Sequence, residues 1–196
     1  MRLRPPDQEK NASSKLKIMI LPVGQVDMDT LNTIRNGLAS AIPESACDIT
    51  KDGLQIPEGA YNPIRHQYKS GIILAAVYGY AERSDAKRVL GVTNVDLYVP
   101  KLNFVFGEAQ YLGKAALISL HRLRPEFYGQ QPNLALFKER AVKEAIHEIG
   151  HTLGLGHCRD PLCIMFFSNS ILDTDRKRPV FCRSCHPLLL RRLESV

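Results

Sequence analysis

Several features are missing from this sequence of 196 residues, and each absence narrows the kinds of protein that it can be. It contains no uninterrupted run of about 18 apolar residues, so we expect no membrane-spanning helix. Residues 1–17 are basic and polar and lack the apolar centre of a secretory signal, so we expect a cytoplasmic protein. No internal repeat or long low-complexity linker occurs, and the length fits one domain, with at most a small appendage.

Aromatic residues are also scarce, at 7% of the chain, and they form no platform of the kind on which RNA bases stack. The net charge of +6 permits contact with nucleic acid without demanding it. Part of the basic excess lies near the C-terminus, at Arg176, Lys177, Arg178, Arg183, Arg191 and Arg192. We interpret this cluster as a solvated face, and we do not expect nucleic acid as a partner.

Hydrophobic residues account for 44% of the chain, which is enough for a core. Their pattern predicts strands at 15–24 and 45–50, helices at 27–42 and 133–153, and further extended segments at 88–99, 103–111 and 114–123. Segment 70–83 could be a strand or a helix, and its length and alanines favour a helix. Short links between these extended segments indicate neighbouring strands. This order of elements is typical of an α+β or mixed α/β fold in which helices pack on a sheet.

The histidines give the first positive signal for function. Three of the six histidines lie within residues 147–158, HEIGHTLGLGHC. On a helix, residues four positions apart lie nearly above one another, so His147 and His151 can present two imidazoles to one ion. Glu148 follows the first histidine and can approach a metal-bound water without being a ligand. This spacing predicts a metal site with a carboxylate beside it.

A catalytic zinc needs a third protein ligand and one open coordination position. Gly154 and Gly156 allow the helix to end sharply and the chain to fold back, because glycine tolerates positive φ. His157 can then return to the same ion, whereas a continuing helix would rotate this position away. A lone histidine on a helix is more often structural, but the glycine and the third histidine at fixed offsets favour the metal site.

Four of the five cysteines lie close together near the C-terminus. They form a C-x4-C pair, Cys158 and Cys163, and a C-x2-C pair, Cys182 and Cys185. In a chain without an export signal, such clustering favours a structural four-cysteine zinc site, with disulfides or free thiols as the alternatives. Cys47 stands alone, and we interpret it as a small buried apolar residue.

The other histidines, His66, His121 and His186, lack this context, and we interpret them as structural or surface residues. His186 follows a cysteine directly, so it is the one that could enter a metal site. Met165 would by itself be interpreted as part of the core.

Together these motifs resemble a known family. HEIGHTLGLGH matches the extended H-E-x-x-H-x-x-G-x-x-H pattern of the metzincin metalloproteases. The continuation, with Met165 among the four clustered cysteines, is similar to that of the archaemetzincins. The segments LGVTNVDLYVP and LNFVFG also look similar to strands of this family. One departure is that 16 residues separate Met165 from Cys182, one fewer than is usual in the family.

The resemblance implies residue roles. Its catalytic zinc would be bound by His147, His151 and His157. Glu148 would be the general base, and Met165 would be the methionine of the turn beneath the metal. A second, structural zinc would be held by Cys158, Cys163, Cys182 and Cys185.

The resemblance also implies an architecture. The fold would be a twisted mixed β-sheet above an active-site helix, with a small zinc-stapled C-terminal subdomain. We expect a polar tail at 1–14, a metzincin-like catalytic domain at 15–157 and a cysteine-rich zinc-binding subdomain at 158–196. The edge strand along the cleft would be 103–111.

These expectations describe a zinc metallopeptidase in which Glu148 activates a zinc-bound water against a peptide bond. The substrate would be a peptide or protein that pairs with strand 103–111, and we expect a monomer that acts away from membranes. One alternative is a zinc hydrolase of short peptides or other amides. Another is a non-catalytic zinc module that binds a partner protein or nucleic acid. Glu148 distinguishes the catalytic interpretations from the non-catalytic one, because a purely structural three-histidine site needs no carboxylate directly after the first histidine.

Overall fold

The structure is a computed structural model that describes residues 16–195. The polar tail predicted at 1–14 lies outside the described residues. None of the helices in the described part combines the length and the apolar character that a membrane span requires.

The centre of the fold is a five-stranded mixed sheet with the strand order β2-β1-β5-β8-β7. Its strands are β1 (Leu16–Val23), β2 (Ser45–Ile49), β5 (Arg88–Thr93), β7 (Gly107–Ala109) and β8 (Ala115–Ser119). The first four strands of this order run parallel, and β7 is antiparallel to β8. β7 is therefore an edge strand, with one side free for pairing.

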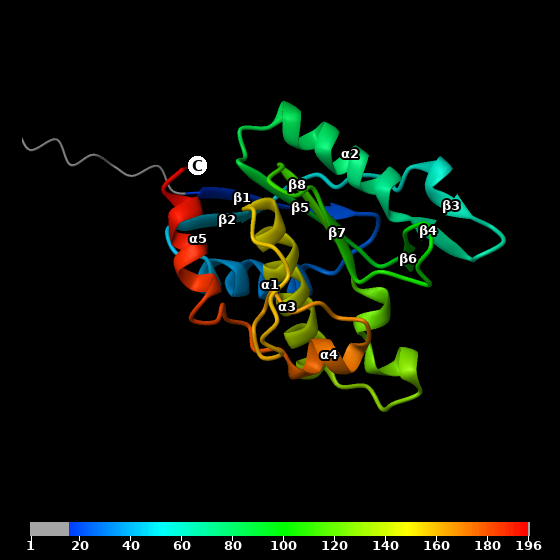
Figure 1. The fold of residues 1–196 in the computed structure, drawn as a ribbon. Coiled ribbons are helices and arrows are strands. Elements are labelled where there is room, and N and C mark those ends of the chain that lie inside the picture. Colours follow the sequence, from blue (N-terminus) through cyan, green and yellow to red (C-terminus); the bar gives the residue numbers. More distant parts are fainter. Residues whose placement is uncertain (1–15, 196) are drawn as a thin grey trace, which may run out of the picture.

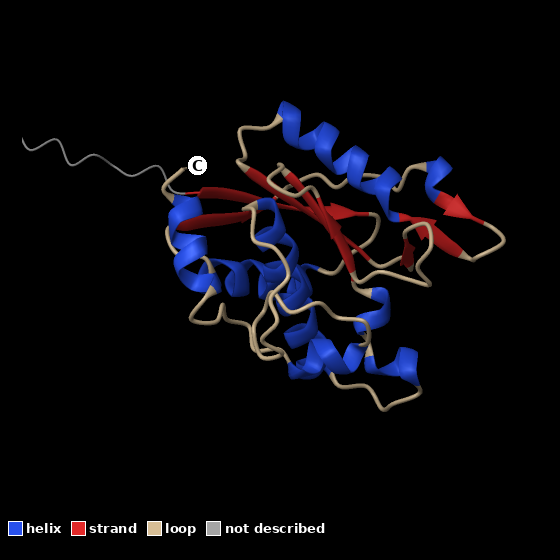
Figure 2. Ribbon diagram, viewed as in Figure 1, coloured by secondary structure: helices blue, strands red, loops and turns tan. Residues whose placement is uncertain are grey.

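Helices cover both faces of this sheet (Figure 1). α2 (Ser70–Arg83) packs on one face, and α1 (Met28–Ala41) and α3 (Leu134–Thr152) pack on the other. Figure 2 shows the strands as a middle layer between these helices. All three helices lie where the sequence predicts them, so the mixed α/β architecture is confirmed.

The first helix illustrates why the sequence pattern was sufficient. The side chain of Asp27 accepts a hydrogen bond from the backbone N–H of Thr30 at 2.8 Å and thereby caps the first turn. Leu31, Ile34 and Leu38 repeat at helical spacing and are fully buried.

A second, three-stranded sheet with the order β3-β4-β6 was not predicted. Its strands are β3 (Tyr61–Asn62), β4 (Gln67–Lys69) and β6 (Leu97–Tyr98). Strands this short show no alternating pattern in the sequence. The hairpin between β3 and β4 supports the segment before β7, because Nη2 of Arg65 donates to the carbonyls of Leu102 and Asn103 at 2.9 Å each.

The extended segments were predicted only in part. Segment 88–99 divides between the two sheets as β5 and β6, and segment 103–111 forms a strand only at β7. β5 and β7 are not neighbours, since β8 lies between them. After β5 the chain first forms β7 at the edge of the sheet and then returns to form β8 beside β5. The short links between the predicted segments do not reveal this order.

The C-terminal segment contains α4 (Ile171–Arg176) and α5 (Cys185–Leu193), which were not predicted as helices. Met165 and Leu189 of this segment belong to the same hydrophobic core as α1 and α3. Short 3-10 helices lie at Glu58–Ala60, His121–Leu123 and Pro125–Tyr128. The C-terminal segment is thus packed onto the helix that carries the histidine motif.

Candidate functional site

Helix α3 presents two histidines and a glutamate to a cleft. His147 and His151 lie on successive turns, and His147 and Glu148 are buried, with 5% and 6% of their surface exposed. His157 follows the helix, and its ring centre lies 5.4 Å from that of His147 and 4.8 Å from that of His151. One nitrogen of each ring lies within 4.8 Å of the others. The structure therefore brings together all three histidines that the sequence analysis singled out.

The end of α3 explains how the third histidine returns. The N–H of Gly154 donates to the carbonyl of His151 at 2.9 Å, and the N–H of Leu155 donates to the carbonyl of Gly150 at 3.0 Å, which is the Schellman pattern. Gly154 has the positive φ, +83°, that this motif requires. Gly156 does not have a positive φ, so the prediction that both glycines reverse the chain was wrong for Gly156.

Backbone carbonyls orient the two helical histidines. Nδ1 of His147 donates to the carbonyl of Ile164, and Nδ1 of His151 donates to that of Leu155, both at 2.8 Å. In a neutral imidazole the other nitrogen then carries no proton. The Nε2 atoms of His147 and His151 consequently face each other as two lone pairs, 3.0 Å apart. Two acceptors cannot satisfy one another, whereas a shared cation satisfies both, so these residues fit a metal ion such as zinc.

The surroundings keep these imidazoles neutral. Burial lowers the pKa of all three histidines, and it lowers that of His147 well below the usual value. The positive charge of Lys177 lowers the three pKa values further. Neutral imidazole is the form that binds metal, so the cluster is prepared for an ion without losing protons.

Glu148 is confined between α3 and the edge strand. A β-carbon at Gly107 of β7 would lie 2.6 Å from Oε1 of Glu148, so a residue without a side chain is needed there. Burial raises the pKa of Glu148 well above its usual value. Repulsion from Glu144 raises it further, and Lys177 opposes this effect. A buried carboxylate with a raised pKa beside metal-binding nitrogens is suited to accept and release a proton.

One turn before Glu148, a buried ion pair supports the helix. Nζ of Lys177 and Oγ1 of Thr174 donate to Oε1 of Glu144 at 2.9 and 3.0 Å. The side chains of Lys177 and Glu144 are 0% and 3% exposed. The prediction of a solvated basic face was therefore wrong for Lys177, because a buried carboxylate compensates its charge, although the arginines of that group are exposed. The pair ties α3 to the end of α4.

A cleft of about 380 Å³ lies over these residues. Segment 102–109, which includes β7, forms one wall, and segment 167–169 lies on the other side. The ring of Phe167 packs 4.8 Å from that of His157. The histidine cluster is thus open to ligands alongside the free edge of β7.

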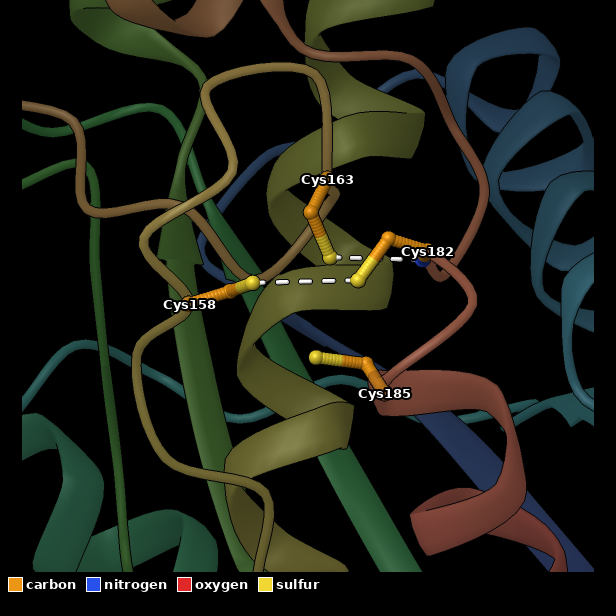
Figure 3. A group of neighbouring side chains, drawn as sticks. All are labelled: Cys158, Cys163, Cys182 and Cys185. Carbon is orange, nitrogen blue, oxygen red and sulfur yellow. Dashed lines mark hydrogen bonds between the residues drawn. The ribbon is translucent and has the colours of Figure 1, made fainter.

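The cysteines near the C-terminus form a second cluster (Figure 3). The Sγ atoms of Cys158 and Cys182 are 3.8 Å apart, and the N–H of Cys182 donates to Sγ of Cys163 at 3.4 Å. Two sulfurs bound to a tetrahedral zinc, each at about 2.3 Å, lie about 3.8 Å from each other. All four cysteines, including Cys185, are free thiols whose sulfurs lie within 4.8 Å of one another, so the set fits a closed metal site better than disulfides.

The thiols of this cluster differ in acidity. Burial raises the pKa of Cys163 to about 11 and raises that of Cys185 as well. Desolvation acts in the same direction on Cys182, but hydrogen bonds from the backbone of Cys185 and Ser184 and from neighbouring thiols lower its pKa to about 7. One thiolate is therefore available at neutral pH to start the binding of a cation.

Met165 packs directly against α3. It is fully buried, and a β-carbon at Gly150 would lie 2.5 Å from its Sδ atom. The carbonyl of Met165 accepts the N–H of Cys158 at 2.8 Å, and the neighbouring carbonyl of Ile164 orients His147. Met165 therefore connects the two clusters, and Gly150, to which the sequence analysis gave no role, permits its close approach.

The remaining candidates lie outside both clusters. His66, His121 and His186 belong to neither group of potential metal ligands among the described residues. Cys47 is only partly buried, so its prediction as a buried residue was wrong. Sequence reasoning missed Gly107 and Glu144; the helical spacing of Glu144 four residues before Glu148 was the one available signal.

Comparisons with known proteins extend the resemblance over most of the chain. The model of Peptidase family M54 matches residues 53–191. An archaemetzincin of Methanocaldococcus jannaschii is 48% identical over 170 residues, which cover 87% of this chain and 90% of the relative. The crystal structure of an archaemetzincin from Methanopyrus kandleri has a TM-score of 0.82 at 38% identity and covers 93% of this chain and 98% of its own. A zinc-dependent peptidase from Methanocorpusculum labreanum has a TM-score of 0.79 at 32% identity, over 88% of this chain and 99% of its own.

The match to the family includes both side-chain clusters and the part of the sheet next to them, since residues 53–191 contain α3, β5, β7, β8 and the four clustered cysteines. It confirms the family that the motifs resemble, and it does not favour the non-catalytic alternative. The chain therefore belongs to the archaemetzincins of peptidase family M54, and it is a zinc metallopeptidase.

Proposed function

We propose that His147, His151 and His157 hold the catalytic zinc ion and that Glu148 is the general base of peptide hydrolysis. The observation that carries this proposal is the pair of unprotonated Nε2 atoms, 3.0 Å apart, that face each other beside Glu148. The ring of His157 supplies the third nitrogen, and the cleft leaves the fourth coordination position accessible.

The reaction follows from this arrangement. When bound, zinc supplies the positive charge that acidifies a water molecule and polarises the peptide carbonyl. Glu148 accepts the proton of the attacking water and delivers it to the nitrogen of the leaving amine. Gly107 keeps room for the Glu148 carboxylate beside the edge strand. His147 and His151 are held by backbone carbonyls, so their orientation is set before a substrate arrives.

The substrate binds as an additional strand on β7. The N–H of Gln110 donates to the carbonyl of Ala115 in β8 at 3.0 Å. Because the direction of backbone groups alternates along a strand, Gly107 and Ala109 direct their N–H and C=O groups to the free edge. An extended peptide can pair with these groups while its carbonyl lies over the histidine cluster.

A second zinc ion is held by the four clustered cysteines, and Met165 is the buried methionine between the two sites. The sulfur spacing and the absence of disulfides among these cysteines support a closed, structural site. In this arrangement residues 158–196 are a zinc-stapled subdomain attached to the catalytic part at 15–157.

The role of Glu148 is tested by Glu148→Ala. We expect this variant to retain its zinc and its fold while hydrolysis of a fluorogenic peptide falls by about 10²- to 10⁴-fold, the usual contribution of a general base. The control is Glu58→Ala, which removes an exposed carboxylate outside the cleft and should leave hydrolysis unchanged. Retained turnover in a zinc-loaded Glu148→Ala preparation would disprove the role.

The assignment of ions is tested by elemental analysis. Wild type should contain two zinc ions per chain, and a His147→Ala/His151→Ala variant should contain one and be inactive. If wild type and the double variant each contained one zinc ion per chain, only the cysteine cluster would bind zinc.

A further inference from the structure

The wall of the cleft carries one carboxylate that the reaction does not use. Glu108 lies in β7 and lines the cleft. Of the other two carboxylates there, Glu148 transfers the proton and Glu144 is neutralised by Lys177. Within residues 16–195, no lysine, arginine or histidine forms an ion pair with Glu108. Its negative charge is therefore available to a ligand that binds along β7.

The strand register places this side chain on the face of the sheet opposite the metal site. Glu108 pairs with Leu117 of β8, which packs in the core beneath α2, whereas Gly107 pairs with Ile118, which packs in the core of α3. Residues paired across two strands direct their side chains to the same face. Glu108 thus points towards α2, and the neighbouring position faces Glu148.

The carboxylate of Glu108 is held in a fixed orientation. Oγ of Ser70, the first residue of α2, donates to Oε2 of Glu108 at 2.5 Å. The positive end of the α2 dipole faces the negative charge, which is a favourable arrangement. Oε1 of Glu108 accepts no hydrogen bond from any residue that the structure describes, so it remains free for a donor.

A substrate added to β7 brings one of its residues directly across from Glu108. If the added strand is antiparallel and pairs with the outward groups of Gly107 and Ala109, the residue across from Glu108 stands in a non-hydrogen-bonded pair. In such pairs the Cα atoms are only about 4.5 Å apart and the side chains approach most closely. That substrate side chain lies on the same face as the Glu108 carboxylate.

We propose that Glu108 is a specificity-determining residue that recognises a cationic group of the substrate, an ammonium or guanidinium, at the position across from it. The inference rests on the proposed addition of the substrate to β7. Opposite charges across two strands attract and like charges repel, so lysine or arginine is favoured at this position and aspartate or glutamate is disfavoured. A free N-terminal ammonium presents the same chemistry when the substrate chain begins there.

The test uses peptides of one neutral sequence, acetylated at the N-terminus and amidated at the C-terminus. Single lysine, glutamine or glutamate residues are placed in turn at each position on either side of the cleaved bond, which mass spectrometry identifies. At one position kcat/KM should be about fivefold higher for lysine than for glutamine, the scale of one cross-strand charge pair. A neutral peptide with a free N-terminus, compared with its acetylated form, distinguishes the ammonium from a side chain as the source of the charge.

The variants make the test specific to Glu108. Glu108→Gln keeps an acceptor for Ser70 and should remove the preference, measured as the ratio of kcat/KM for the lysine and glutamine peptides. Glu108→Lys should reverse the preference in favour of glutamate. Glu58→Gln changes the net charge equally at an exposed site and should alter nothing. An identical order of preference in wild type, Glu108→Gln and Glu108→Lys would overturn the inference.

Binding separates this inference from the catalytic proposal. The same peptides, carrying a fluorophore, are titrated against Glu148→Ala and Glu148→Ala/Glu108→Gln, and anisotropy reports affinity without turnover. If Glu148→Ala binds the cationic peptide more tightly and Glu148→Ala/Glu108→Gln does not, the role of Glu108 is supported. This result would hold even if wild type hydrolysed none of these peptides and the catalytic proposal failed. Equal affinity for all peptides in both variants would contradict the role of Glu108.

Discussion

The histidine cluster and the cysteine cluster meet at a single peptide bond, between His157 and Cys158, and yet they are built differently. His147 and His151 are fixed by backbone carbonyls, and the three histidines line a cleft of about 380 Å³. The cysteines surround a point from four sides, and backbone N–H groups donate to their sulfurs (Figure 3). The two groups of potential metal ligands are adjacent in the chain, but they differ in one respect. The three histidines leave a coordination position of a bound metal open to the cleft, whereas the four cysteines would fill every position.

This difference suits the histidine cluster to catalysis and the cysteine cluster to stabilising the fold. Three protein ligands and an open position suit a metal that must bind water and substrate, whereas four thiolates leave no place for either. The cysteine cluster also joins segments that are 24 residues apart, Cys158 and Cys182, and so fixes the chain that carries Met165 beneath α3. If the cysteine cluster binds zinc as proposed, it therefore holds in place the surroundings of the histidine cluster.

The largest effect is expected when the closed site is destroyed. Cys182→Ser/Cys185→Ser should lose one zinc ion and several kcal/mol of stability, because the binding free energy of a structural zinc, about 10–16 kcal/mol in small zinc-binding peptides, also stabilises the fold. The midpoint of thermal unfolding and the zinc content measure both losses. Cys47→Ser, which removes a thiol outside the cluster, is the matched control. An unchanged unfolding midpoint would show that the clusters do not differ in this way.

The next largest effect is expected at the buried ion pair between Glu144 of α3 and Lys177 of the C-terminal segment. Lys177→Met leaves the carboxylate of Glu144 buried without a charged partner and should lower the free energy of unfolding by about 3–5 kcal/mol, measured in urea. Lys177→Met/Glu144→Leu should recover much of this loss, because neither charge then remains buried. Lys114→Met breaks an exposed pair with Glu82 and should cost less than about 1 kcal/mol. Equal losses in both single variants would contradict a special role for the buried pair.

The histidine motif could be predicted from the sequence because its parts are local. His147 and His151 are one helical turn apart, and the Schellman turn at Gly154 needs only the next few residues. Glu144 and Lys177 are 33 residues apart, and nothing in either segment marks them as partners. Their pairing depends on how the C-terminal segment packs against α3, which is a property of the tertiary structure.

The same reasoning explains what was missed in the sheet. Helices α1, α2 and α3 and strand β1 follow the hydrophobic period, so their positions could be predicted within one or two residues. β7 has three residues, and its place at the edge is set by pairing with β8 rather than by its own pattern. The close approach of Gly107 to Glu148 follows only once that pairing is known.

Zinc uptake by the two clusters should respond differently to pH. Burial raises the pKa of Cys163 to about 11 and raises that of Cys185, so both thiols carry protons at neutral pH and must lose them to bind zinc. The histidines, whose pKa values are lowered by burial, are already neutral above about pH 6.5 and lose none. With at least two protons released, the affinity of the cysteine cluster should rise by at least about 100-fold per pH unit, while that of the histidine cluster should stay nearly constant.

Calorimetry measures this contrast directly. Metal-free protein is titrated with zinc in two buffers of different ionisation enthalpy, which gives the protons released per ion. His147→Ala/His151→Ala isolates the cysteine cluster, and the difference from wild type gives the histidine cluster. Equal proton release by the two clusters would contradict the contrast.

The smallest effect concerns the two glycines between the clusters, which look alike in the sequence. Gly154 has φ of +83°, and a β-carbon there would lie 2.3 Å from Cδ2 of Leu112, so Gly154→Ala should destabilise the protein by about 1–3 kcal/mol. Gly156 has no positive φ and open space around it, so Gly156→Ala should change stability by less than about 0.5 kcal/mol. Because the Schellman turn carries the carbonyl of Leu155 that orients His151, Gly154→Ala should also weaken zinc binding at the histidine cluster and leave the cysteine cluster loaded. Urea unfolding and zinc content measure the two effects, and equal losses in both variants would mean that the return of the chain does not depend on the left-handed turn at Gly154.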